Sequence, residues 1–275
     1  KPTWYQAVPT MMHDIVSKVK REQRLVEHSS LRFCRSVSSP LPLNIREAFE
    51  HLFKLPVIEI YGMTETAGVI TSNVIESSDA LENTHNLSAS RTVGKSVGAE
   101  VQVADSMGNP AKTNQRGEVI VRGDSVFSGY ITTDQSQLEA SSLSERENFI
   151  NGWFKTGDEG YLDESGHLFL TGRIKDIINR GGEKISPIEV DTILRQHPLI
   201  EDAACFAFIH ASLGEDITAA IVLKSKNKIN DHDIRAFLAN LLAQHKIPHH
   251  IFFVKSLPRT TGGKLQRHRL TDTYC

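Results

Sequence analysis

The sequence contains little cysteine, and its cysteines form no pattern. Its 275 residues include only Cys34, Cys205 and Cys275, and no two of them form a Cys-x-x-Cys pair. An odd and widely spaced set of this kind supports neither a disulfide framework nor the ligand spacing of a zinc site. We therefore expect a protein of a reduced compartment without structural zinc.

Long apolar runs and an excess of positive charge are also missing. No run approaches the roughly 20 residues of a membrane-spanning helix, and the N-terminus lacks the basic-then-apolar pattern of a signal peptide. A formal net charge of -2 argues against a general nucleic-acid binder. The last residues, Thr273-Tyr274-Cys275, are not a peroxisomal Ser-Lys-Leu signal. These absences predict a soluble, intracellular and cytoplasmic protein with no membrane span.

The first 90 residues have the pattern of an α/β layer. Helix-forming composition covers 11–28 and 44–53, and strand-like apolar runs cover 31–36 and 56–60. Helices and short strands that alternate in this way are typical of α/β layering. The polar, Ser- and Asn-rich segment 76–90 is expected to be a surface loop.

The remaining residues favour two further regions. Strand-like runs at 100–103, 118–121 and 167–170, separated by Gly and Asn turns, predict a β-rich subdomain over 91–172 that forms a small antiparallel barrel or sheet. Residues 173–275 combine strand-like runs at 203–209 and 218–223 with helical patterns at 187–196 and 231–244. The predicted fold class is therefore α/β plus α+β, with a domain boundary after residue 172.

The junction from Thr171 to Glu189 combines paired glycines with the start of a helix. Gly181 and Gly182 can adopt backbone conformations that are closed to other residues. Ser186-Pro187-Ile188-Glu189 then offers an N-cap, a Pro at the first helical position and a Glu at the third. We expect a flexible loop that acts as a hinge and enters a firmly started helix.

Three other segments accompany this junction. They are Tyr61-Gly62-Met63-Thr64-Glu65, Trp153-Phe154-Lys155-Thr156-Gly157-Asp158 and Pro258-Arg259-Thr260-Thr261-Gly262-Gly263-Lys264-Leu265-Gln266-Arg267. The four motifs in this order resemble the adenylate-forming (AMP-binding) superfamily, which includes acyl-CoA synthetases, coumarate-type CoA ligases, peptide-synthetase adenylation domains and luciferases. The resemblance implies the distal part of a large N-terminal domain, a sheet with helices and a small β-barrel, over 1–172. It also implies a compact and mobile α+β C-terminal domain over 173–275.

The resemblance implies a site for ATP or AMP in the first of these domains. There Tyr61 stacks on the adenine, Thr64 bonds the α-phosphate, and Glu65 helps hold Mg²⁺, a hard cation that prefers oxygen ligands. Asp158 accepts hydrogen bonds from the ribose diol, and Arg173 makes a second contact near ribose and phosphate. Further cofactor-binding positions that it implies are Ser38, Ser39, Glu59, Gly62 and Met63.

The same resemblance implies a two-step reaction and assigns residues of the C-terminal domain to each step. Lys264 reaches the reacting carboxylate and the α-phosphate and acts as a catalytic residue together with Thr64 and Glu65. Lys264 is not a P-loop lysine, because the flanking positions of a Walker motif hold Pro258 and Leu265. The C-terminal domain rotates about Lys175. The face that carries Gly181, Gly182 and Glu183 then lines a tunnel for the pantetheine arm of CoA.

One loop bears on the branch of the family. Ser36-Val37-Ser38-Ser39-Pro40 is nearer to the oxalyl-CoA synthetase-like branch than to relatives with Gly-Ala-Ala before the Pro. That branch usually carries a His where this chain has Gly68, which argues against a small dicarboxylate substrate. The 12 histidines show no metal or triad spacing.

The implied function is an ATP-dependent acid–thiol ligase that forms an acyl-adenylate and then an acyl-CoA from a small carboxylic acid and CoA. No Ser/Thr/Gly-rich phosphate loop precedes the motifs, so the chain is expected to lack the N-terminal half of the same enzyme and to be inactive alone. Two alternatives remain: an adenylation module that loads a carrier protein, and a non-catalytic half that binds AMP as a regulatory module.

Overall fold

The computed structural model describes residues 1–19, 26, 29–74, 92–130, 148–224 and 229–274. The chain forms two compact units, Lys1–Leu170 and Thr171–Cys275. The division between them lies two residues before the predicted boundary. The surface loop expected at 76–90 lies outside the described residues. So do residues 20–25 and 27–28 of the helix expected at 11–28.

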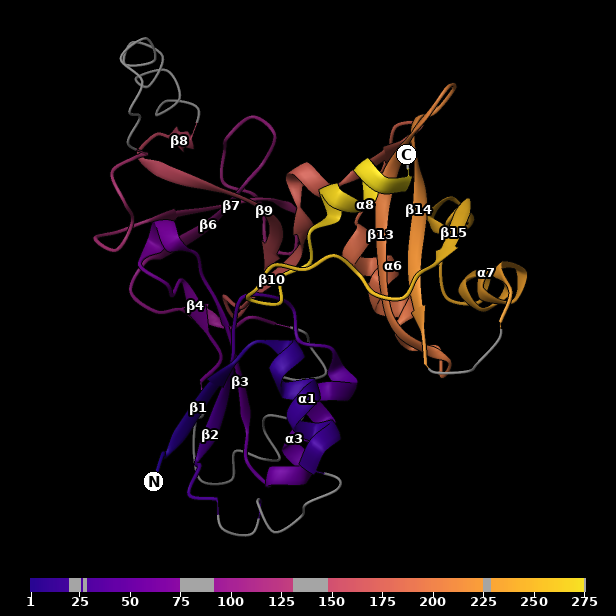
Figure 1. Ribbon diagram of the computed structural model, residues 1–275. Coiled ribbons are helices and arrows are strands. Elements are labelled where there is room, and N and C mark those ends of the chain that lie inside the picture. The colour runs from indigo at the N-terminus through magenta and orange to yellow at the C-terminus, as the bar shows by residue number, and fades with distance from the viewer. Residues whose placement is uncertain (20–25, 27–28, 75–91, 131–147, 225–228, 275) are drawn as a thin grey trace. The chain divides into compact units, whose positions relative to one another are not determined.

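The first unit opens with a mixed five-stranded sheet. Its strands are β1 (Trp4–Ala7), β2 (Phe33–Ser36), β3 (Val57–Tyr61), β4 (Thr71–Ser72) and β5 (Lys95–Ser96), in that order across the sheet. The first three strands are parallel, and β4 and β5 join the sheet in antiparallel pairs. Helices α1 (Pro9–Val19) and α3 (Leu43–Phe53) lie side by side along β1 to β3 (Figure 1). This arrangement confirms the predicted α/β layer.

The helices pack through the apolar positions of their sequences. Met12 of α1 and Phe49 of α3 are buried with Val57 of β3, and the ring of Phe49 stacks on Phe53 at 4.5 Å between centroids. Helix α3 ends where Lys54 adopts a left-handed conformation (φ 54°) and donates its backbone N–H to the carbonyl of residue 50. This ending directs the chain into β3, whose carboxyl end carries the first predicted motif.

The first unit continues into an antiparallel sheet. Its strands are β6 (Glu100–Ala104), β7 (Gly117–Arg122), β8 (Phe149–Ile150), β9 (Trp153–Leu162) and β10 (Leu168–Arg173), with the order β10-β9-β7-β6 and β8 paired to β9. Tyr61, at the end of β3, is buried in the same cluster as Val119 of β7 and Phe154 of β9. The shared core therefore places the end of β3 against the antiparallel sheet.

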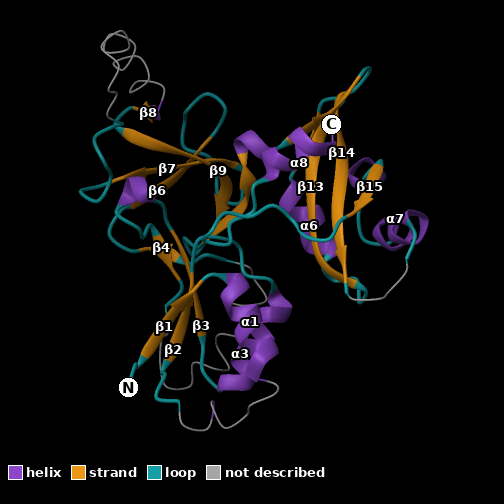
Figure 2. Ribbon diagram, in the orientation of Figure 1, coloured by secondary structure: helices purple, strands orange, loops and turns teal. Residues whose placement is uncertain are grey.

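The second unit is α+β (Figure 2). Its strands are β11 (Ile178–Arg180), β12 (Glu183–Ile185), β13 (Ile200–His210), β14 (Gly214–Leu223) and β15 (His250–Phe253); its helices are α6 (Pro187–Leu194), α7 (Asp231–Ala239) and α8 (Arg267–Tyr274). The order is β12-β11-β14-β13, and β15 runs parallel to β14.

Helices pack on this sheet through two separate apolar clusters. Leu194 of α6 and Leu238 of α7 are buried in one cluster with Ile217 of β14. Leu270 of α8 is buried in a second cluster with Phe206 of β13. Because neighbouring residues of a strand point to opposite faces, the two clusters cover the two faces of the β13–β14 hairpin.

The expected flexible loop at the paired glycines is wrong. Arg180 and Glu183 are directly paired across β11 and β12, so Gly181 and Gly182 form a two-residue hairpin turn. Both glycines have positive φ, 58° and 93°, as the favoured two-residue turns of hairpins require. The Gly-Gly pair therefore shapes a tight turn.

The helix that follows starts where predicted but is capped differently. Ser186 is the N-cap of α6 and Pro187 occupies its first turn, yet the Ser186 side chain makes no capping bond. Its hydroxyl donates to the carbonyl of Thr171. Glu189 accepts two hydrogen bonds from Lys246 Nζ, at 2.7 and 2.8 Å. Ser186 thus occupies the predicted N-cap position, but its side chain and that of Glu189 have partners outside the first turn of the helix.

No helix in the part of the chain that the structure describes is long and apolar enough to cross a membrane.

Candidate active site

The parallel strands of the first unit end together at one edge. Ala7 pairs with Ser36, and Ser36 pairs with Glu59, so β1, β2 and β3 reach that edge in register. Ser38, which is exposed with φ 74°, and the half-buried Ser39 follow β2 there. In sheets of this type, ligands bind beyond the carboxyl ends of the strands.

Two predicted nucleotide residues meet at this edge. The Tyr61 hydroxyl donates a 2.7 Å hydrogen bond to Asp158 Oδ2, although the residues lie 97 positions apart. Their exposed fractions are 8% and 7%. Asp158 lies within β9, and its backbone N–H donates to the Thr156 hydroxyl (3.1 Å). The orientation of the Asp158 carboxylate is therefore fixed by its place in β9 and by the hydrogen bond from Tyr61.

The turn after Tyr61 requires a glycine at its first position. A Cβ atom on Gly62 would lie 1.8 Å from the carbonyl oxygen of Gly68, so no other residue fits without movement of the backbone. A 3-10 turn over Thr64–Thr66 follows, and the half-buried Met63 precedes it. Thr64 is exposed, which leaves its hydroxyl accessible for the predicted phosphate contact.

Glu65 has a partner that sequence reasoning missed. Tyr130 donates its hydroxyl to Glu65 Oε1 at 2.7 Å, and Phe127 donates its backbone N–H to the carbonyl of the same residue. The hydrogen bond to Glu65, together with burial, raises the pKa of Tyr130 to about 12. No motif marks Tyr130, because its relation to Glu65 depends on the path of the intervening chain.

Glu59 lies in a buried ion-pair group. Arg46 donates from Nη1 to Glu59 Oε1 (3.0 Å) and from Nε to Glu50 Oε1 (3.3 Å). Burial raises the pKa of Glu59 more than the attraction of Arg46 lowers it. The structure thus gives Glu59 a clear role in joining α3 to β3, and its predicted contact with nucleotide stays a prediction.

The residues of the second unit that are predicted to bind ligands lie at the surface. Arg173, Lys175, Gly181, Gly182 and Glu183 are all solvent-exposed. Lys175 lies in a 3-10 turn over Ile174–Asp176. These positions are accessible to ligands.

Lys264 is exposed at the end of a closed turn. The Lys264 N–H donates to the Thr260 hydroxyl (3.1 Å), and the Thr260 N–H donates to the Lys264 carbonyl (2.8 Å). Gly263, which has φ 81°, donates its N–H to the Thr260 carbonyl (2.9 Å). The ammonium is therefore presented from a turn of fixed backbone shape.

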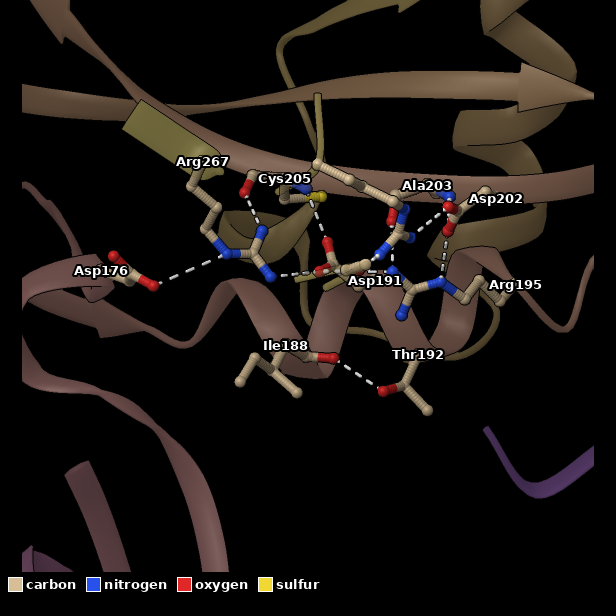
Figure 3. Close-up of polar contacts among 11 residues, drawn as sticks. Asp176, Ile188, Asp191, Thr192, Arg195, Asp202, Ala203, Cys205 and Arg267 are labelled. Carbon is tan, nitrogen blue, oxygen red and sulfur yellow. Dashed lines mark hydrogen bonds and ion pairs between the residues drawn. The ribbon is translucent and has the colours of Figure 1, made fainter. Parts of the chain in front are cut away.

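The motif that carries Lys264 ends in a polar cluster around Arg267 and Asp191 (Figure 3). Arg267, the last residue of the motif, donates to Asp191 of α6 and to the backbone carbonyl of Cys205, and its Nε lies 3.8 Å from Asp176 Oδ2. Asp191 is 1% exposed and also accepts the Cys205 N–H (2.6 Å). Arg267 thus joins the end of the Lys264 turn, helix α6 and the segment after Lys175.

Metal ligands are sparse in the part of the chain that the structure describes: no group of three or more His, Cys, Asp and Glu residues there could hold a metal ion. A site that uses Glu65 would therefore need oxygen ligands from a substrate and from water, as Mg²⁺ sites commonly do.

Comparisons with known proteins match both units. The AMP-binding enzyme family matches residues 1–131, and the AMP-binding enzyme C-terminal domain matches residues 189–264. The oxalate–CoA ligase of Arabidopsis thaliana is 38% identical over 272 residues, which cover 99% of this chain and 50% of that protein. The oxalate–CoA ligase of Saccharomyces cerevisiae is 38% identical over 271 residues, which cover 98% of this chain and 47% of that protein.

A solved structure of a protein that binds ATP also matches the whole chain. The crystal structure of ATP-bound MatB from Rhodopseudomonas palustris superimposes with a TM-score of 0.86 and 28% identity. The match covers 100% of this chain and 51% of that one. The chain spans about half the length of the curated relatives and of the structure that it matches.

Proposed function

We propose that this chain, which belongs to the AMP-binding enzyme family, contributes the C-terminal half of an AMP-forming acid–thiol ligase. Such an enzyme converts a carboxylic acid and ATP into an acyl-adenylate, and then converts the acyl-adenylate and CoA into an acyl-CoA. The names of two relatives, both oxalate–CoA ligases, support a small carboxylic acid and CoA as the substrate classes.

The observation that carries the proposal is the contact between Tyr61 and Asp158 at the carboxyl end of β3. An aromatic ring and a carboxylate placed together suit a nucleoside, because the ring can stack on a base while the carboxylate accepts from a ribose hydroxyl. The hydroxyl of Ser36, at the end of β2, is buried without a partner among the described residues. A polar ligand at this edge would meet an unsatisfied group, which fits a nucleotide.

Adenylate formation joins an oxygen of the substrate carboxylate to the α-phosphorus of ATP while the bond to pyrophosphate breaks. In our proposal Thr64 donates its hydroxyl to the α-phosphate, and the Lys264 ammonium offsets the negative charge that develops in the transition state. Preorganised donors of this kind commonly make the largest contribution to catalysis. Both side chains are exposed, as this role requires.

Glu65 would bind Mg²⁺, and Tyr130 would orient the carboxylate through its 2.7 Å hydrogen bond. The ion would neutralise phosphate charge when bound. One carboxylate suits a cation that usually keeps water and phosphate ligands.

Thioester formation joins the sulfur of CoA to the acyl carbon and releases AMP. We propose that the mobile domain, residues 173–275, rotates about Lys175 between the two steps and presents the Gly181–Gly182 turn and Glu183 to the pantetheine arm. A turn without side chains leaves room for a narrow ligand close to the backbone. Arg173 precedes the pivot at Lys175 and therefore remains on the nucleotide side in this scheme.

The relatives are about twice as long as this chain, so we propose that activity requires the half that corresponds to their N-terminal portion. The test is ATP–pyrophosphate exchange by residues 1–275 and by a version extended upstream to the length of the relatives. We expect exchange only from the extended version. Robust exchange by residues 1–275 would refute this requirement, and AMP binding without turnover by the extended version would favour a regulatory role.

A further inference from the structure

We propose that two arginine–aspartate pairs are positioning pairs, Arg259–Asp202 for the turn that carries Lys264 and Arg180–Asp216 for the Gly181–Gly182 turn. The inference rests on the proposed function and adds to it the residues that hold each of its two working surfaces in place. Neither pair contains a residue to which the proposed reaction assigns a contact with substrate.

The backbone bonds of the Lys264 turn fix its shape but not its orientation on the unit. The bonds between Thr260 and Lys264, and the bond from the Gln266 N–H to the Pro258 carbonyl (2.9 Å), all lie inside the segment 258–266. Orientation has to come from contacts with the rest of the unit. Arg259 provides such a contact from within the turn.

Arg259 connects the turn to strand β13 through two bonds of one guanidinium group. Its Nη1 donates to the carbonyl of Gly263, the residue before Lys264, at 2.8 Å, and its Nη2 donates to Asp202 Oδ2 at 2.6 Å. Arg195, the C-cap residue of α6, donates from Nε to Asp202 Oδ1 at 2.9 Å (Figure 3 shows this pair). Asp202 therefore accepts hydrogen bonds from two arginines, one of which, Arg259, belongs to the Lys264 turn.

The electrostatics of Asp202 agree with this role. Burial raises its pKa, but the attraction of Arg195 and the hydrogen bond from Arg259 outweigh burial and hold the pKa below its ordinary value. The carboxylate is therefore charged at neutral pH and makes charge-assisted hydrogen bonds, which are stronger than neutral ones.

The Gly181–Gly182 turn has a separate anchor. Arg180, the residue before the turn, donates from Nε to Asp216 Oδ1 at 2.5 Å. Asp216 lies on β14 and is fully buried. Gly181 donates its N–H to the carbonyl of Leu213 at 2.8 Å. Arg180 Nη1 also donates to the carbonyl of His245 at 3.3 Å. Contacts of Arg180 and of Gly181 thus anchor the start of the turn.

The two anchors lie on the two strands of one hairpin and share no residue. In the β13–β14 register, Asp202 pairs with Val222 and Asp216 pairs with Phe208. Residues 202 and 208 are six positions apart on β13, a separation of about 20 Å along the strand. A substitution in one pair therefore leaves the contacts of the other intact, and each pair is the matched control for the other.

The test measures both half-reactions in the upstream-extended protein that carries Asp202→Asn, Arg259→Gln or Arg180→Gln. For the second pair we substitute Arg180 and not Asp216. The Arg180 side chain is 25% exposed, whereas Asp216 is fully buried and its substitution would disturb the core. Adenylate formation is followed by ATP–pyrophosphate exchange, and thioester formation by CoA consumption from supplied acyl-adenylate.

We expect Asp202→Asn and Arg259→Gln to lower the kcat of adenylate formation about tenfold or more, with the KM for ATP and the rate of thioester formation within about twofold. We expect Arg180→Gln to show the opposite selectivity. Arg259→Lys keeps the charge but not the two-bond geometry, and it should recover only part of the rate.

Variants that lower both half-reactions by the same factor, or neither, would overturn the inference while the proposed function stands. An unsubstituted extended protein that carries out neither half-reaction would instead refute the proposed function, and the inference with it. Urea denaturation of each variant separates loss of fold from loss of positioning, since general destabilisation does not choose between the two half-reactions.

Discussion

The hydroxyl of Tyr61 donates directly to the carboxylate of Asp158, and this bond joins the end of a parallel strand to the middle of an antiparallel one. The two side chains come from motifs that lie 97 positions apart along the chain. Their contact is a property of the fold, and it places a ring and a carboxylate where the proposed function needs a nucleoside site.

Tyr61→Phe tests the structural part of this relationship. The substitution keeps the ring but removes a donor from a buried carboxylate, so we expect the free energy of unfolding of the chain to fall by about 1–3 kcal/mol in urea denaturation. Tyr161→Phe is the control, because the Tyr161 ring stacks on Phe169 and its hydroxyl has no hydrogen bond within the described residues. Equal losses in the two variants would contradict the contact.

Glu59→Gln tests the buried group around Arg46. The pKa of Glu59 lies above its ordinary value of 4.5, mainly because of burial. The folded chain therefore holds this proton more tightly than the unfolded chain does, and the group's contribution to stability falls as the pH rises above 4.5. We expect the stability of Glu59→Gln relative to the unsubstituted chain to increase from about pH 4 to pH 7.

The control for this pH dependence is Glu47→Gln, which changes an exposed carboxylate on α3. Unfolding free energies are measured for the three proteins at each pH. A difference between Glu59→Gln and the unsubstituted chain that stays constant with pH would show that Glu59 titrates normally.

The buried cysteines should be unreactive. Burial raises the pKa of Cys34 to about 12 and raises the pKa of Cys205 well above its ordinary value. Since the thiolate is the reactive form, we expect neither thiol of a Cys275→Ser variant to react with a thiol reagent at pH of about 8 while the protein is folded. Both should react after unfolding in guanidinium. Rapid labelling of one thiol per native chain would contradict the burial.

Periodicity predicted the elements that have a simple pattern. The apolar run before Tyr61 and the helix that ends at Phe53 are found as β3 and α3 within one residue of the predicted ends. Strand β9, Trp153–Leu162, was not predicted, because its sequence contains two glycines and charged residues. Its neighbours in the sheet, β7 on one side and β8 and β10 on the other, supply the hydrogen bonds that stabilise it. Tertiary pairing here outweighs local propensity.

The prediction of the site from sequence also lacks the contacts that depend on tertiary pairing. The motifs predicted Asp158 and Lys264 as site residues, but the residues that contact Asp158 and the Lys264 turn come from distant parts of the sequence. Asp202 and Asp216 lie outside every motif. The contact of Asp216 with Arg180 depends on the pairing of β11 with β14, and the contact of Asp202 with Arg259 joins residues 57 positions apart. The Gly181–Gly182 pair was misjudged because paired glycines suit both flexible loops and tight hairpin turns.

The central claim is that one chain serves two half-reactions through different surfaces of its second unit, and Lys264→Ala in the upstream-extended protein tests it most directly. The substitution removes an exposed ammonium and leaves the backbone of the turn in place, so folding should be unaffected. We expect ATP–pyrophosphate exchange to fall by about a thousandfold, as for the loss of a main electrostatic contact in a transition state. Thioester formation from supplied acyl-adenylate should stay within about twofold, since this step does not use Lys264. Equal loss of both half-reactions would contradict the account.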